Sequence, residues 1–121
     1  MIDGDKRGEE TLFMYTQKDI YIIDFTNVNH YFEMHEVIRK ALDFPDYYGC
    51  NWDAFWDCLT DMIGLTVHIR IFGLDVIERA FPGEAEIMVD ILREFKHYGN
   101  DRFSDDIKIE IVKGNLISNI Y

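Results

Sequence analysis

Three aspartates spaced one helical turn apart are the residues of this chain best suited to do chemistry. Asp53, Asp57 and Asp61 follow the pattern i, i+4 and i+8, so a helix aligns them in one row. Repulsion along such a row costs roughly a few tenths of a kcal/mol per pair, so folding alone does not favour it. Carboxylates in a row accept charge-assisted, often bidentate hydrogen bonds from guanidinium groups. The row therefore predicts a surface that binds a cationic partner, and the alternative is a solvated face of an acidic protein.

Two other kinds of chemistry could use the same carboxylates. Asp53 and Asp57 could be the general acid and base of a glycosidase, but that reaction needs a substrate cleft, which nothing in this chain indicates. Asp57 and Asp61 could hold a divalent cation, although magnesium and calcium sites usually draw their oxygen ligands from loops. No Ser/His/Asp, Cys/His or phosphate-loop pattern is present. The histidines are scattered: His30, His35, His68 and His97. We therefore expect no enzymatic activity, no metal and no cofactor.

A bend followed by a helix positions the aspartates. Gly49 predicts the bend, because glycine takes positive φ without steric cost. Asn51 is the expected N-cap, and Asp53 then lies in the first turn, near the positive end of the helix dipole. The apolar face at helical spacing is the expected core face: Phe55, Cys58, Leu59 and Met62. The opposite face carries Asp53, Asp57, Thr60 and Asp61, with Trp56 at the border.

Composition limits the class of protein and of partner. The chain has 121 residues and 48% hydrophobic residues, which is typical of one globular domain over residues 1–121. Its net charge of −11 disfavours nucleic acid and anionic membranes and favours a basic protein as partner. The apolar runs are too short for a membrane span, and residues 1–10 contain no secretory signal. Cys50 and Cys58 are poorly placed for a metal or a disulfide, so we expect a reduced, cytoplasmic protein.

The first half of the chain alternates an expected strand with an expected helix. Residues 1–10 read as a polar lead-in, and residues 11–15 as a short edge strand. The apolar run Ile20 to Phe25 predicts a buried strand. Asn27 or Asn29 is the expected cap of a helix that Pro45 ends. The apolar stripe of that helix is Tyr31, Met34, His35, Ile38, Ala41 and Leu42.

The second half continues the alternation. Alternating apolar residues predict strands at residues 65–72, which Gly73 ends, and at residues 107–111. Residues 74–81 predict a short helix, and Glu84 to Tyr98 a longer one that Gly99 ends. Residues 100–106 read as a polar loop, and residues 113–121 are left unplaced. The inward face of the longer helix is expected to be Met88, Ile91, Leu92, Phe95 and Tyr98. We expect an α/β protein with a three-stranded parallel sheet and about four helices.

The residues around the bend closely resemble the signature loop and second helix of the barstar family, which are intracellular inhibitors of a small bacterial ribonuclease. The resemblance extends weakly over residues 20–112 and returns in the last helix. The matching residues are Phe44-Pro45-Asp46-Tyr47-Tyr48-Gly49-x-Asn51-x-Asp53-Ala54-x-Trp56-Asp57-Cys58-Leu59-Thr60 and Leu92-Arg93-Glu94-x-Lys96, followed by Gly99.

The resemblance implies the same small α/β layer fold and a function. A barstar-like protein would block the active site of a small basic ribonuclease with an acidic helix-and-loop face that mimics RNA phosphates. Asp57 would be the central mimic, with Asp53 and Glu94 as supporting anions. Thr60 and Asp61 lie on the same predicted face. The loop and apolar part of the contact would come from Tyr47, Gly49, Asn51, Trp52 and Trp56.

A structural role remains the alternative for several of these residues. Asn51 could only cap a helix, Trp52 could belong to the core, and Tyr47 could pack on the loop. The chain also departs from the family on this face, where Cys50 replaces an acidic residue, Trp52 a leucine, and Asp61-Met62 a glycine and a tryptophan. The rival function is therefore the same fold used as an immunity or interaction module against a different basic toxin or regulatory partner.

Overall fold

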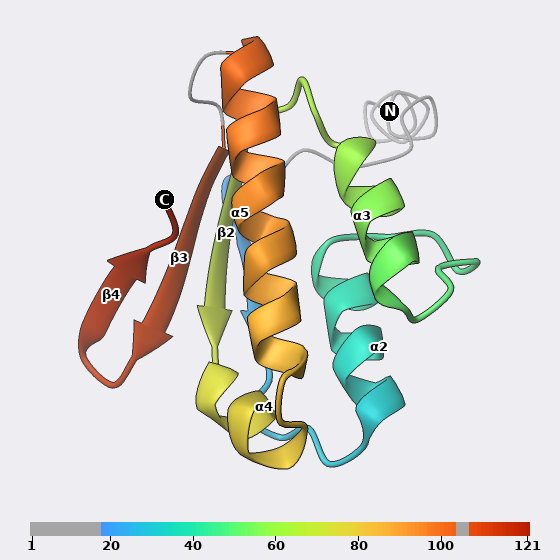
Figure 1. Cartoon of the computed structure of the whole chain (residues 1–121), viewed down its shortest axis with the longest axis vertical. Helices are drawn as coiled ribbons and strands as arrows, with labels where there is room; N and C mark the ends of the chain where they lie inside the picture. Colours follow the sequence, from blue (N-terminus) through green and yellow to red (C-terminus); the bar gives the residue numbers. More distant parts are fainter. Residues whose placement is uncertain (1–17, 104–106) are drawn as a thin grey trace, which may run out of the picture.

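The computed structural model describes residues 18–103 and 107–121. The polar lead-in predicted over residues 1–10 and the edge strand predicted over residues 11–15 lie outside this range. The described chain forms one sheet with helices packed against it (Figure 1). The predicted α/β class is confirmed.

The sheet has four strands in the order in which they occur in the sequence. They are β1 (Tyr21–Asp24), β2 (Val67–Phe72), β3 (Ile107–Lys113) and β4 (Leu116–Asn119). The first three are parallel, as predicted, and β4 pairs with β3 antiparallel. The strand count therefore differs from the prediction. Gly114, with φ of 59°, lets the chain reverse tightly after β3, and the unplaced residues form β4.

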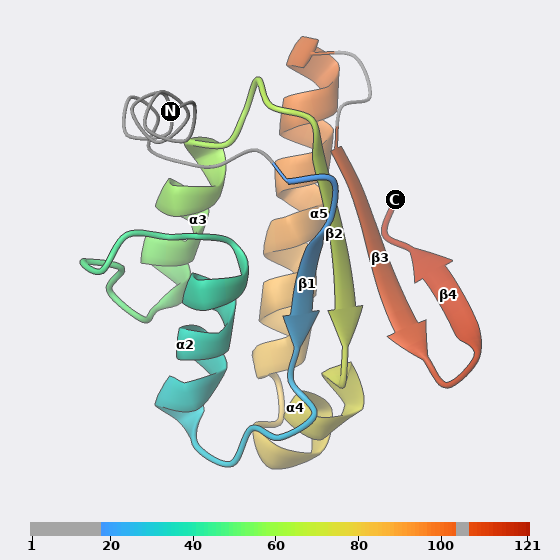
Figure 2. The same ribbon diagram turned by 180° about the vertical axis from the view of Figure 1, so that it is seen from behind.

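Three helices of the described chain lie on one face of this sheet, and a fourth follows the end of β2 (Figure 1). They are α2 (Tyr31–Ala41), α3 (Trp52–Thr60), α4 (Leu74–Ala80) and α5 (Glu84–Phe103). Helix α5 runs along the sheet over β2, and α2 and α3 lie beside α5 on the side away from β4 (Figure 1). From behind, β1 and β2 lie in front of α5 with no described helix over them (Figure 2).

Strand periodicity explains the one-sided core. Val67, Ile69 and Ile71 of β2 are fully buried, while the residues between them are half-buried. The predicted core face of α3 is confirmed, because Phe55, Cys58, Leu59 and Met62 are all buried. Strand β1 is less buried than predicted, since its second residue, Ile22, is 43% exposed on the uncovered face.

The start of α2 corrects a predicted cap. The N-cap residue is His30, and neither Asn27 nor Asn29 occupies that position. The Glu33 carboxylate reaches back and accepts hydrogen bonds from the backbone N–H groups of Asn29 (2.7 Å) and His30 (3.4 Å). Glu33 therefore fastens the two residues that precede the helix, and His30 takes the cap position in place of an asparagine.

The last helix corrects a predicted stop. Helix α5 continues through Gly99 and Asn100 to Phe103, so the loop predicted over residues 100–106 is wrong for its first part. Gly99 is buried where α5 crosses β3, and a Cβ there would clash with the Ile107 side chain. The glycine therefore serves close packing rather than helix termination. Tyr98 also differs from its predicted inward position, being 42% exposed.

Candidate partner-binding site

The loop before α3 is fastened to α2. The Tyr48 backbone N–H donates to the Pro45 carbonyl at 3.0 Å, which closes a turn. The buried Tyr48 hydroxyl lies 2.7 Å from His35 Nδ1, and Arg39 donates to the Asp46 carboxylate at 3.1 Å. The loop is thus held on one side by a buried hydrogen bond and on the other by an ion pair.

The bend itself differs from the prediction. The left-handed residue is Cys50, with φ of 53°, and Gly49 lies outside that region. A Cβ on Gly49 would sit 3.2 Å from Asn51 Nδ2 and 3.5 Å from Ala54 Cβ, so Gly49 gives the loop room against α3. The predicted N-cap is confirmed, because Asn51 Oδ1 accepts from the Ala54 N–H at 2.8 Å.

The predicted row of carboxylates lies on the exposed face of α3. Asp53, Asp57 and Asp61 are exposed, and Trp56 is half-buried at the border of this face, as predicted. Thr60 lies half-buried beside them and donates its hydroxyl to the Asp57 carbonyl at 2.8 Å. The helix therefore presents three negative charges to solvent along one side.

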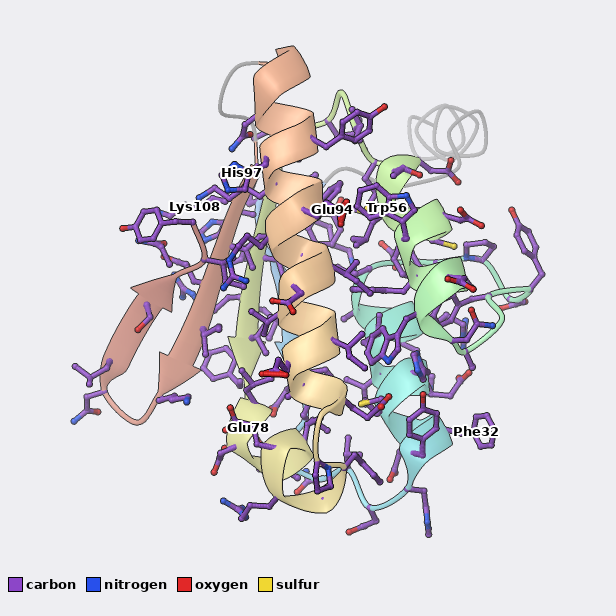
Figure 3. All side chains as sticks on the ribbon, in the orientation of Figure 1. Phe32, Trp56, Glu78, Glu94, His97 and Lys108 are labelled. Atoms are coloured by element: carbon purple, nitrogen blue, oxygen red, sulfur yellow. The ribbon has the colours of Figure 1, made fainter. Side chains whose placement is uncertain are left out.

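Helix α5 brings a fourth carboxylate to the same place. A shallow hollow of about 420 Å³ lies between α3 and α5. Trp56 and Glu94 project from the two helices toward this space (Figure 3). Its lining is Trp52, Asp53, Trp56, Asp57, Ile91 and Glu94. Five sequence-predicted residues thus converge, and Ile91, expected to face the core, lies at the edge of the hollow.

The other predicted residues lie around this hollow without lining it. Thr60 and Asp61 lie at the far end of α3, and Gly49 and Asn51 shape its start. Tyr47 is 75% exposed, so it projects from the loop and does not pack against it. The candidate surface consequently has a central hollow, a loop on one side and an acidic helix end on the other.

Missing ion pairs distinguish these carboxylates from most others in the described chain. Asp53, Asp57, Asp61 and Glu94 form no ion pair with any side chain at positions 18–100 or 107–121. Three helical acids elsewhere have partners one turn away on their own helix: Glu36 with Arg39, Asp75 with Arg79 and Asp90 with Arg93. The surface therefore carries negative charge that no described side chain neutralises, as a site for a cationic partner requires.

Comparison with known proteins identifies the family. Residues 19–110 match the sequence model of the family described as Barstar (barnase inhibitor). The chain belongs to the barstar family. A protein of Bacillus subtilis (strain 168) named "Putative ribonuclease inhibitor YrdF" is 31% identical over 80 residues, which cover 66% of this chain and 85% of the relative. The resemblance inferred from the sequence is confirmed.

The barstar-family match contains the loop, α3, α5 and hence the whole hollow. Strand β4 lies beyond it. The family and the name of the relative both point to an inhibitor rather than an enzyme. Over the part of the chain that the structure describes, no three His, Cys, Asp or Glu side chains gather as metal ligands. No helix within that part is long and apolar enough to span a membrane.

The cysteines of this barstar-family protein are weak nucleophiles. Cys50 and Cys58 are both free thiols. Burial raises the pKa of each, and the carboxylates near them raise it further: Glu36 beside Cys50, and Asp61 and Asp57 beside Cys58. Both groups therefore stay protonated at neutral pH.

Two residues of the site were missed in the sequence. Glu84 accepts a hydrogen bond from Trp52 Nε1 at 2.8 Å, and the Tyr98 ring lies 6.2 Å from the Trp56 ring. Tyr98 had a detectable signal, because it follows Glu94 by four residues and so shares its face of α5. Glu84 had none, since it lies 32 positions from Trp52 and only the fold brings them together.

Proposed function

We propose that this barstar-family protein inhibits a small basic ribonuclease by filling its active-site cleft with the acidic face of α3 and α5. The observation that carries the proposal is the hollow between the two helices. Three carboxylates line it, from Asp53, Asp57 and Glu94, and none has a cationic partner among the side chains at positions 18–100 and 107–121. A cleft that binds RNA phosphates with arginine, lysine and histidine is the complement of such a surface.

The mechanism is occlusion without chemistry. Asp57 takes the place of a phosphate at the centre of the cleft, and Asp53 and Glu94 receive hydrogen bonds from neighbouring cations. Guanidinium groups bind such carboxylates with two parallel hydrogen bonds, which gives direction as well as energy. The net charge of −11 accelerates the encounter with a basic enzyme and makes it sensitive to salt.

The surrounding residues supply shape. Trp52 and Trp56 form the aromatic wall of the hollow, and Tyr47 projects beside it from the loop. Gly49 and Asn51 hold the loop against the start of α3, while Thr60 and Asp61 extend the contact along the helix. Aromatic side chains around a charged centre are typical of interface hot spots. We place this activity in the cytoplasm, where the two thiols stay reduced.

A second candidate is an immunity or interaction module of the same fold that binds a different basic toxin or regulatory protein. The observation that favours it is the position of the departures from the family pattern. Trp52 lines the hollow, Cys50 is the left-handed residue of the bend, and Asp61 adds a charge at the end of α3. These changes alter the binding face while leaving the fold intact.

An RNA-hydrolysis assay tests the proposal. A panel of small basic bacterial ribonucleases is titrated with the wild-type protein, Asp57→Asn and Glu78→Gln, at low and moderate salt. Glu78→Gln removes the same charge from α4, far from Trp56 and Glu94 (Figure 3). We expect one enzyme to be inhibited stoichiometrically, and Asp57→Asn to weaken this by about 30-fold or more, as for a hot spot.

The control variant and the salt series show whether inhibition depends on the assigned site and on charge. Glu78→Gln should inhibit like the wild-type protein, and inhibition should weaken as salt screens the charges. Full inhibition by Asp57→Asn would contradict the assigned site. Absence of inhibition across the panel would contradict the ribonuclease assignment and favour the second candidate.

A further inference from the structure

We propose that Trp52 is the specificity-determining residue of the hollow, that Glu84 positions it, and that the indole selects ribonucleases which present an arginine side chain to its face. The inference rests on the proposed function, because it names the chemical group that the site accepts. It concerns a residue at which this chain carries tryptophan where the family pattern has leucine, so it addresses a property of this chain rather than of the family.

Trp52 is held from three directions. Its Nε1–H donates to Glu84 Oε1 at 2.8 Å, so α5 fixes the edge of the indole. The His35 ring of α2 packs against it with ring centroids 4.6 Å apart, and the Phe55 ring of α3 lies 5.3 Å away. The side chain is half-buried, and its remaining surface lines the hollow. Since a leucine has no N–H, the contact with Glu84 is available only to the tryptophan.

Glu84 is itself in a favourable position to hold the indole. It lies in the first turn of α5, where the positive end of the helix dipole stabilises a carboxylate. The same carboxylate acts on Tyr31 of α2, since burial and then the nearby Glu84 raise the pKa of that tyrosine. One carboxylate thus connects α2, α3 and α5 behind the wall of the hollow.

The group behind the indole is neutral. His35 is completely buried, and its Nε2 has no hydrogen-bond partner in the described chain. Burial lowers the pKa of His35, although the nearby Glu84 opposes the shift, so the ring carries no charge at neutral pH. An incoming cation on the other face of Trp52 therefore meets no positive charge behind the ring.

Arginine is the side chain that suits this wall. A guanidinium is flat, weakly hydrated and able to stack on an aromatic face, whereas a lysine ammonium is a compact and strongly hydrated charge. Asp53 and Glu94 line the same hollow and can accept the N–H groups at the edges of the stacked guanidinium. A leucine at position 52 would retain apolar contact but lose both the stacking face and the link to Glu84.

The positioning role of Glu84 can be measured without any ribonuclease. The protein has two tryptophans, so a Trp56→Phe background leaves Trp52 as the sole indole reporter. In that background we expect Glu84→Ala to shift the Trp52 emission to the red and to increase its quenching by acrylamide. Glu84→Gln keeps an acceptor and should restore most of the signal. Glu86→Ala, in the same turn of α5, is the matched control and should change neither property. An unchanged signal in folded Glu84→Ala would overturn the positioning role.

Selectivity is tested with the inhibited ribonuclease and variants of it in which each cleft arginine is replaced by lysine. We expect Trp52→Leu to lose about tenfold in affinity, the size of a single stacked cation, and Trp52→Phe to lose less. One arginine replacement should weaken binding to the wild-type protein more than binding to Trp52→Leu, because only the wild-type protein loses the stacking contact as well. Equal losses for both inhibitors at every arginine would overturn the stacking assignment. If the wild-type protein inhibits no enzyme, the proposed function and the arginine assignment both fail, while the fluorescence result alone decides the role of Glu84.

Discussion

Two groups of carboxylates in this protein have opposite surroundings. On the uncovered face of the sheet, Glu110 of β3 is only 6% exposed. One of its oxygens lies 2.6 Å from His68 Nε2 and 3.0 Å from Arg70 Nε, and the other lies 3.6 Å from Lys108 Nζ. In the hollow between α3 and α5, Asp57 is exposed and forms no ion pair with the side chains of residues 18–100 or 107–121.

The difference indicates where each charge finds its partner. Glu110 finds cations on its own strand and on β2, so its negative charge stabilises the sheet. Asp57 and its neighbours stand beside one another and leave their hydrogen-bonding capacity free for a second molecule. Carboxylates with internal partners therefore contribute to folding, and those without them are available for binding. The predictions below test this division, beginning with the largest expected effect on stability.

Removing the charge of Glu110 should destabilise the fold. In Glu110→Gln, Arg70 and Lys108 lose the opposite charge that pairs with them, and His68 and Arg70 are left with a neutral acceptor, so we expect a loss of about 2 kcal/mol in the free energy of unfolding. Urea unfolding followed by circular dichroism measures this loss. A change below about 0.5 kcal/mol, the range of ordinary surface substitutions, would show that the cluster around Glu110 contributes little to stability. It would contradict the claim that the paired carboxylates stabilise the fold.

The same cluster should make stability depend on pH. The hydrogen bonds from His68 and Arg70 hold the pKa of Glu110 below its ordinary value of 4.5. The unfolded chain therefore binds a proton more readily than the folded one, and the contribution of Glu110 is present above pH 4.5 and lost as the pH falls below it. Unfolding at a series of pH values should show a steeper acid loss for the wild-type protein than for Glu110→Gln. Parallel curves would contradict this assignment.

Asn51, at the end of the loop before α3, should stabilise the fold through its N-cap hydrogen bond. In Asn51→Ala the Ala54 N–H loses its acceptor, and we expect the free energy of unfolding to fall by about 1 kcal/mol. Asn51→Ser keeps a capping oxygen and should retain most of the stability. Thermal unfolding of the two variants distinguishes a cap from a residue that acts only at the interface, for which both substitutions would leave stability unchanged.

The smallest effect on stability is expected in the acidic row. Asp61→Asn relieves repulsion from Asp57 one turn earlier, so stability should stay constant or rise by roughly a few tenths of a kcal/mol. Unfolding in low salt, where the repulsion is least screened, gives the best chance of detecting the gain. A clear loss of stability would mean that the row has a structural partner and does not belong to the unpaired group.

Much of the fold was predictable because burial imposes a period on the sequence. The alternation in β2 and the helical spacing of Phe55, Cys58 and Leu59 both follow from which side faces the core. Strand β4 was not predictable in this way, because all four of its residues are exposed and no period results. The roles predicted for Gly49 and Gly99, a left-handed bend and a helix stop, were wrong for the same reason. Each glycine lets the backbone pack closely against another side chain, Ala54 for Gly49 and Ile107 for Gly99. Only the tertiary structure determines such packing.

The candidate site was predictable where it is local. The spacing of Asp53, Asp57 and Asp61 and the Asn51 cap are properties of one helix and were visible in the sequence. Glu94 came from the family resemblance together with its place at the edge of an apolar stripe, and it lines the hollow. The contact between Trp52 and Glu84 was invisible because no pattern connects two residues on different helices.

The most direct test of the division between the two groups is to measure both properties on both variants. The free energy of unfolding and the inhibition constant against the responsive ribonuclease are determined for Asp57→Asn and Glu110→Gln under one buffer condition. We predict a crossed result, in which Asp57→Asn keeps its stability and loses inhibition, and Glu110→Gln loses stability yet inhibits normally while folded. Loss of both properties in Asp57→Asn, or loss of inhibition by folded Glu110→Gln, would contradict the account.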